Sequence, residues 1–144
     1  MVKKEFTPFK GSNEDSSFAV DLWVRTDKSQ ELWCDISVPE PACRSYLQLG
    51  SDKNPGKAAA KAESSKLSKY NAALKRRGKV GVSVVPLIIE TGGFLGQHFI
   101  DFLKTIEKES SDGPSKDILL SQISVTLVKA NVACIREAGR KALA

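Results

Sequence analysis

The sequence is poor in the residues that usually carry metal or nucleophilic chemistry. Its 144 residues include one histidine and three cysteines. Cys34, Cys43 and Cys134 show neither a CxxC motif nor Cys/His zinc spacing, and their odd number argues against a disulfide framework. We therefore expect a reducing, intracellular setting. His98 has no Ser or Cys at a catalytic spacing, so we interpret it as a half-buried helix residue.

Long apolar segments are also scarce. We find no apolar run near the roughly 20 residues that a membrane helix needs, so we expect no membrane partner. The N-terminal stretch MVKKEFTPFKGSNEDSS has no apolar segment after its first lysines, which argues against a secretory leader. We expect residues 1–17 to be a flexible lead-in and residues 18–144 to form one domain.

Acidic residues are nearly missing from residues 53–79, where nine Lys or Arg accompany one acid, Glu63, for a local net charge of +8. The whole chain carries +5. One interpretation is a solvated helix face, and the other is a surface that faces phosphates. The KRRGK run (75–79) would serve as a weak nuclear targeting signal or complement a helix dipole. The basic residues we expect to contact nucleic acid are Lys57, Lys61, Lys69, Lys75, Arg76 and Arg77.

Strict alternation over 18–25 and 31–38, around a polar turn, predicts a β-hairpin with one apolar face. That face comprises Phe18, Val20, Leu22, Val24, Leu32, Cys34, Ile36 and Val38. Helices are predicted over 57–78, over 95–109, and from Lys116 to about Ala138 with Ser115 as N-cap. Residues 81–90 predict a strand, and Pro86 favours an edge position or a bulge in it. The order ββαβαα indicates an α/β fold in which a small mixed sheet is flanked by helices.

Each hairpin arm carries one aspartate, a residue disfavoured in strands. A symmetrical hairpin would place Asp21 opposite Asp35, Trp23 opposite Trp33 and Arg25 opposite Glu31. Adjacent like charges repel, so we expect either a raised pKa on one acid or a divalent cation between them. Oxygen ligands suit Mg²⁺ or Mn²⁺. The alternative is that both are simply exposed acids on a solvated sheet face.

The helix over 57–78 brings charge toward the same layer. Its Leu67, Tyr70 and Leu74 share one stripe, Glu63 falls within that stripe and Lys66 lies on its edge. A lysine close to two metal-binding acids can stabilise charge on a phosphate. The alternative for Lys66 is an aliphatic stem that covers the margin of the stripe.

These motifs together resemble a known family. They are AVDLWV, then CDISVPEP, then an alanine-rich helix with K-x-x-K-Y, then PLIIETGG. The order is similar to that of the restriction-like endonuclease domain of site-specific non-LTR retrotransposon polyproteins, within the PD-(D/E)XK superfamily. The similarity covers roughly residues 18–135. Val20 stands where that family usually has proline, and Ser37 stands at the lysine of the acid-x-Lys motif.

The resemblance implies a metal-dependent DNA endonuclease, a phosphodiester hydrolase with nicking activity. It assigns Asp21 and Asp35 to Mg²⁺ (or Mn²⁺) and moves the basic role to Lys66, with Lys69 and Glu63 in support. Glu90 is a more distant candidate. Implied partners are DNA and a reverse transcriptase region of the same polyprotein, with nuclear localisation; a homodimer is compatible with the sequence. The alternatives are a catalytically inactive nucleic-acid-binding or interaction module on the same fold, and an unrelated basic α/β domain.

Overall fold

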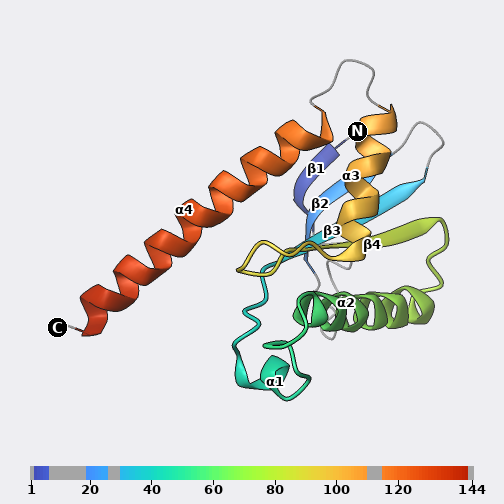
Figure 1. Cartoon of the computed structure of the whole chain (residues 1–144). Coiled ribbons are helices and arrows are strands. Elements are labelled where there is room, and N and C mark those ends of the chain that lie inside the picture. The colour runs from blue at the N-terminus through green and yellow to red at the C-terminus, as the bar shows by residue number, and fades with distance from the viewer. Residues whose placement is uncertain (1, 7–18, 26–29, 110–114, 143–144) are drawn as a thin grey trace.

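The computed structural model describes residues 2–6, 19–25, 30–109 and 115–142. Four strands form one sheet in the spatial order β1-β2-β3-β4, with β1 and β3 antiparallel to β2 and β4 parallel to β3. The strands are β1 (Val2–Phe6), β2 (Val20–Arg25), β3 (Glu31–Ser37) and β4 (Val82–Ile88). The helices are α1 (Arg44–Leu47), α2 (Lys57–Arg76), α3 (Gln97–Glu109) and α4 (Lys116–Ala142). The prediction of an α/β fold with a small mixed sheet and flanking helices is confirmed (Figure 1).

The hairpin register follows the sequence pattern. Trp23 pairs with Trp33, and Arg25 pairs with Glu31. The last register pair in the other direction is Leu22 with Cys34, so Asp21 and Asp35 are the next residues beyond it. The predicted pairing is thus confirmed up to the residue adjacent to each aspartate.

Part of the expected lead-in belongs to the sheet. Val2–Phe6 form β1, which pairs along β2 from Val2 opposite Val24 to Phe6 opposite Val20. The lead-in prediction is corrected for these residues because β2 would otherwise be an edge strand with unpaired backbone groups. The rest of the predicted lead-in lies outside the described residues.

Pro86 lies in an edge strand, as predicted. β4 has one neighbour, β3, and Pro86 is paired with Asp35. Proline lacks the N–H that an interior strand would need, so the edge is where a sheet accepts it. The strand is covered on both faces, with Leu87 in contact with the α3 side and Ile88 packed against α2 alanines.

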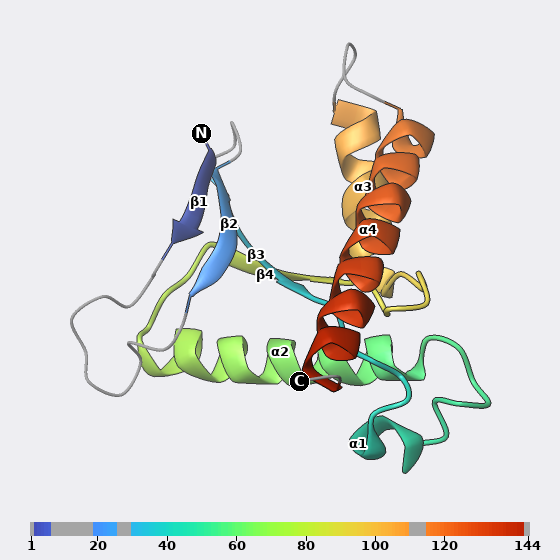
Figure 2. The same ribbon diagram turned by 90° about the vertical axis from the view of Figure 1, so that its left-hand side faces the viewer.

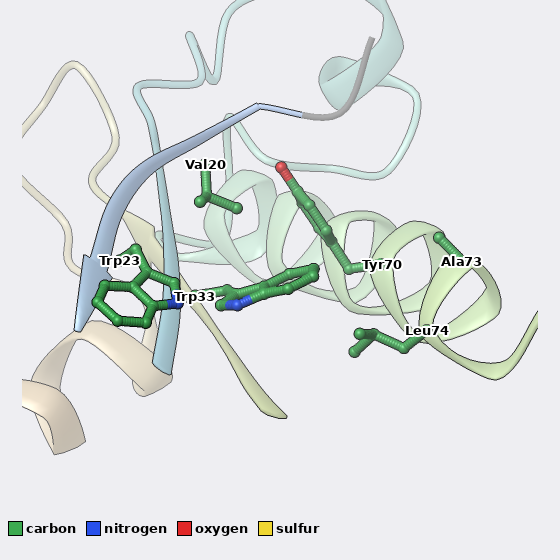
Figure 3. Close-up of a cluster of buried hydrophobic side chains, with 6 residues drawn as sticks. All are labelled: Val20, Trp23, Trp33, Tyr70, Ala73 and Leu74. Atoms are coloured by element: carbon green, nitrogen blue, oxygen red, sulfur yellow. The ribbon is translucent and has the colours of Figure 1, made fainter. Parts of the chain in front are cut away.

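The two faces of the sheet carry separate cores, one under α2 and one under α3 and α4 (Figure 2). The α2 core holds Val20, Trp23, Trp33, Tyr70, Ala73 and Leu74 (Figure 3). The face with the tryptophans is therefore buried rather than solvated. Val20 packs on this side and not with Leu22, which contradicts the strict alternation predicted for β2. The register pairs of β2 with β3 stop at Leu22, and this break lets Val20 turn toward the other core.

The α4 stripe predicted as one apolar face is in fact two. Ser115 caps the helix, and its Oγ accepts the Ile118 N–H at 3.4 Å. Leu120, Ile123 and Leu127 pack against the α3 core. Val128, Val132 and Ile135, predicted on the same stripe, are exposed. Successive helix residues are rotated by 100°, and this rotation places the two groups on different sides of α4 although the predicted stripe combined them.

The same helix corrects the membrane expectation in one respect. Lys116–Ala138 is long and apolar enough, with a mean hydropathy of 1.7, to pass a length and composition test for a membrane span. Polar residues interrupt this segment, so the sequence shows no continuous apolar run there.

Candidate functional site

The predicted lysine does meet the predicted acid. Lys66 Nζ lies 2.7 Å from Asp35 Oδ2, and the Asp35 side chain is 12% exposed against 24% for Lys66. Asp35 comes from the middle of the sheet and Lys66 from the margin of the buried face of α2. Two elements that are distant in sequence thus form a largely enclosed ion pair. The helical spacing predicted only that Lys66 faces the layer of the sheet.

Asp21 is the more exposed carboxylate and has a different partner. Its Oδ2 accepts the backbone N–H of Ile36 at 2.6 Å. Continuing the hairpin register would place Val20 opposite Ile36. The Asp21 side chain therefore serves as acceptor at the point where the regular pairs end, which explains why an aspartate is tolerated in this strand.

Tyr70 joins the site from α2, one turn after Lys66. The side chain is buried and its hydroxyl donates to the carbonyl of Ala19 at 2.6 Å. Burial raises the pKa of Tyr70, and the carboxylates of Asp35 and Asp21 raise it further. The sequence analysis places Tyr70 only on the packing stripe of the helix. Its i, i+4 spacing from Lys66 is the signal that would have indicated a position beside the same acids.

The divalent cation expected between the aspartates stays a prediction, and two protein groups also offset their charges. The ammonium of Lys66 offsets the charge of Asp35, and the Ile36 amide stabilises that of Asp21. Among the described residues, no group of three or more His, Cys, Asp or Glu side chains could hold a metal ion. The donor set is two carboxylates, which fits Mg²⁺ only where water or phosphate oxygens complete its shell.

Glu63 lies elsewhere than predicted. It is buried, and its Oε1 accepts the backbone N–H of His98 at 2.9 Å while Oε2 lies 3.3 Å from His98 Nδ1. The first turn of α3 has no acidic residue of its own, so Glu63 supplies negative charge at that N-terminus. Glu63 is thus a capping residue for α3, and the structure does not bring it to the aspartates.

Glu90 plays the reciprocal part for α2. It is buried, and its Oε1 accepts the Ala59 N–H at 2.9 Å while Oε2 accepts the Gly56 N–H at 3.4 Å. The first turn of α2 likewise has no acid. These contacts place Glu90 at a helix terminus, away from the role of distant metal contact that the sequence suggested.

The glycines around these caps explain the close packing. Gly56 has φ +86°, and a Cβ there would collide with the ring of Phe94. A Cβ on Gly96 would collide with the Glu63 carboxylate. A tight turn precedes α3, with Gly93 N–H donating to Glu90 O at 2.7 Å.

The predicted tryptophan pair shields this face of the sheet. Trp33 is fully buried and Trp23 nearly so. Both indole N–H groups donate to Glu31 Oε2, at 3.2 Å from Trp23 and 3.3 Å from Trp33. Lys79 Nζ lies 5.3 Å from the Trp33 ring centroid, a cation–π contact.

The expected nucleic-acid contacts are exposed but do not converge on the acids. Helical periodicity places Lys57, Lys61 and Lys75 within 40° of one another on the outer side of α2, roughly opposite Lys66. Lys57 Nζ also donates to the carbonyl of Leu49 at 2.9 Å. Lys69, Arg76 and Arg77 are exposed as well. The basic face and the acid pair are therefore two separate features.

No family model, curated protein or solved structure matches this chain. The arrangement of Asp21, Asp35 and Lys66 is thus interpreted from its own geometry.

Proposed function

We propose that this protein is a metal-dependent DNA endonuclease of the retrotransposon restriction-like type. The observation that carries the proposal is the Asp35–Lys66 contact, with Asp21, the second residue of β2, accepting the N–H of Ile36, the residue after Asp35. Two acids from the adjacent strands β2 and β3 and a lysine from α2 form the set expected for phosphodiester hydrolysis. The sequence motifs that resemble those of such enzymes include these three residues.

In this mechanism Asp21 and Asp35 would hold Mg²⁺ or Mn²⁺ together with a substrate phosphate. When bound, the ion supplies Lewis-acid activation of the attacking water. Lys66 would place its charge where negative charge grows on the phosphate. Tyr70, tied to Ala19, would hold the start of β2 and hence Asp21 in position. Lys69 lies exposed on the same helix and would add positive charge to the surrounding field.

Nicking of supercoiled plasmid tests the proposal. Asp21→Asn keeps an oxygen that can accept the Ile36 N–H, so we expect a folded protein whose Mg²⁺-dependent nicking falls by at least about a hundredfold. Asp35→Asn should lose activity similarly. The matched control is Asp52→Asn, which changes an exposed acid away from the pair and should retain activity. Nicking that survives both Asp21→Asn and Asp35→Asn, or persists in chelator, would refute the assignment.

One observation favours a second function, a nucleic-acid-binding module without catalysis. The Asp35 charge is already neutralised by Lys66, while exposed lysines gather on the outer face of α2. Such a module would bind DNA with strong salt dependence and no Mg²⁺ requirement. Lys61→Ala and Lys75→Ala should each weaken binding similarly for all sequences and reduce the salt slope by about one. Fluorescence anisotropy with Mg²⁺ or chelator separates the two functions.

A further inference from the structure

The outer face of α4 carries a regular apolar series distinct from its core contacts. Its positions alternate three and four residues apart, which is the a/d spacing of a heptad repeat. They are Ile118, Ser121, Val125, Val128, Val132 and Ile135. Five of the six are β-branched and apolar, and these expose from 40% at Val132 to 71% at Ile135. We call this series the α4 seam.

The seam is free to face outward because another side of α4 holds the domain. Leu120, Ile123 and Leu127 pack on the α3 core, and at 100° per residue this side lies roughly 140° from the seam. Asn131 Nδ2 donates to the Thr91 carbonyl at 2.8 Å, so the attachment continues into the second half of the helix. Beyond it, α4 extends away from the sheet (Figure 1).

We propose that α4 pairs with α4 of another copy of this chain, through the seam, as a parallel coiled coil. A 3.5-residue apolar repeat keeps one seam facing one partner helix over its whole length, and a helix with the same repeat is the complement. Within the part of one chain that the structure describes, the seam stays exposed. The series spans only two and a half heptads, so the association should be weak and concentration-dependent.

The charges beside the seam select the parallel orientation. On one flank lie Gln122, Lys129 and Arg136, and on the other lie Asp117, Ser124 and Asn131. In a parallel pair the first flank faces the second flank of the partner, so each cation meets a neutral polar residue. In an antiparallel pair the first flanks face each other, and Lys129 and Arg136 of both copies would repel.

A lipid bilayer is the competing partner for an apolar helix. Lys129 falls near the middle of Lys116–Ala138, and at that depth its charge would sit in hydrocarbon. In a coiled coil the same residue flanks the seam and stays in water. The repeat and the position of Lys129 together favour a second copy of the chain.

The test is the solution mass of the full chain as a function of concentration, from micromolar to sub-millimolar. We expect it to rise from the 15.7 kDa of one chain toward two or three times that value, since β-branched residues at both seam positions permit three strands. Val128→Glu should hold the chain at the single-chain mass. The matched control Ala133→Glu, on the same helix outside the seam, should associate as the natural sequence does. Circular dichroism checks that each variant folds.

Orientation is tested by a seam cysteine in a chain with Cys43→Ser and Cys134→Ser, which removes the two exposed thiols. Parallel, in-register helices bring both copies of residue 128 together, so Val128→Cys should oxidise to a cross-linked dimer and Ala133→Cys should not. A constant single-chain mass, association that survives Val128→Glu, or a monomer that co-floats with phosphatidylcholine vesicles would each overturn the proposal.

Discussion

Removing the charge of Lys66 tests whether the site is also a structural element. Lys66→Met keeps the aliphatic stem and deletes the ammonium, so Asp35 is left without its partner at 2.7 Å. Breaking a fully buried ion pair costs about 3–5 kcal/mol, and an exposed pair contributes about 0–1 kcal/mol. Asp35 is 12% exposed and Lys66 is 24% exposed, so we expect an intermediate loss of about 2 kcal/mol.

Urea unfolding monitored by circular dichroism measures this loss of unfolding free energy. In a thermal melt, a loss of about 2 kcal/mol should lower the melting temperature by roughly 4–8 °C in a chain of this size. Adding Asp35→Asn to Lys66→Met should restore about 1 kcal/mol, because the second change removes the unpaired charge. Lys61→Met on the outer face of α2 is the control and should change stability by less than about 0.5 kcal/mol.

Equal stability of Lys66→Met and the natural sequence, or strictly additive effects of the two changes, would refute the view that this ion pair stabilises the fold. Lys66→Arg adds a functional arm. It keeps a positive charge beside Asp35 but changes its geometry, so we expect near-natural stability and reduced nicking. This variant separates a role in positioning charge from a role in folding.

Two further predictions concern the core. Gly96→Ala should lower the free energy of unfolding by about 1–2 kcal/mol, because the new Cβ displaces the Glu63 carboxylate that caps α3. Gly92→Ala is the control and should change stability little, because the space around Gly92 is open. Equal melting temperatures of the two variants would contradict the capping role of Glu63. Burial raises the pKa of the Cys34 thiol from 9.0 to about 11 in the folded state. As the pH rises, this thiol therefore loses its proton first in the unfolded state, and the free energy of unfolding falls between about pH 9 and pH 11. Cys34→Val, measured by urea unfolding at pH 8 and pH 10.5, should reduce this alkaline loss by on the order of 2 kcal/mol, and an unchanged pH dependence would contradict it.

The periodicity of apolar residues could predict which way a side chain points from its own helix or strand. The hairpin register followed from closing the two alternating arms symmetrically about the turn, which pairs Trp23 with Trp33. Lys66 followed from its angle on the helix. The same angular argument gave a wrong partner for Glu63, because a helical wheel gives the direction of a side chain and not its position along the helix axis. Glu63 lies about one turn before Lys66 and therefore meets the start of α3.

Other features depend on segments that the sequence does not join. β1 could not be predicted from its own few residues, because a short strand is defined by its partner, here β2. The burial of the Trp23 and Trp33 face came from α2, which packs there after a long connection. The spacing of the α4 seam is present in the sequence. The predicted stripe nevertheless combined Val128 and Ile135, which belong to the seam, with Leu120 and Leu127, which pack against the core.

The partners of the two aspartates bear on how a nuclease of this design would work. Lys66 and the Ile36 amide already offset the repulsion between Asp35 and Asp21, so the fold does not require a metal to be stable. Under the proposed function, metal and substrate would then have to compete with Lys66 for Asp35. A ligand that binds only the folded state raises the melting temperature. We therefore expect Mn²⁺ alone to stabilise the protein weakly, and Mn²⁺ to stabilise it more strongly once Lys66→Met leaves Asp35 unpaired. The reverse order would place the metal away from Asp35.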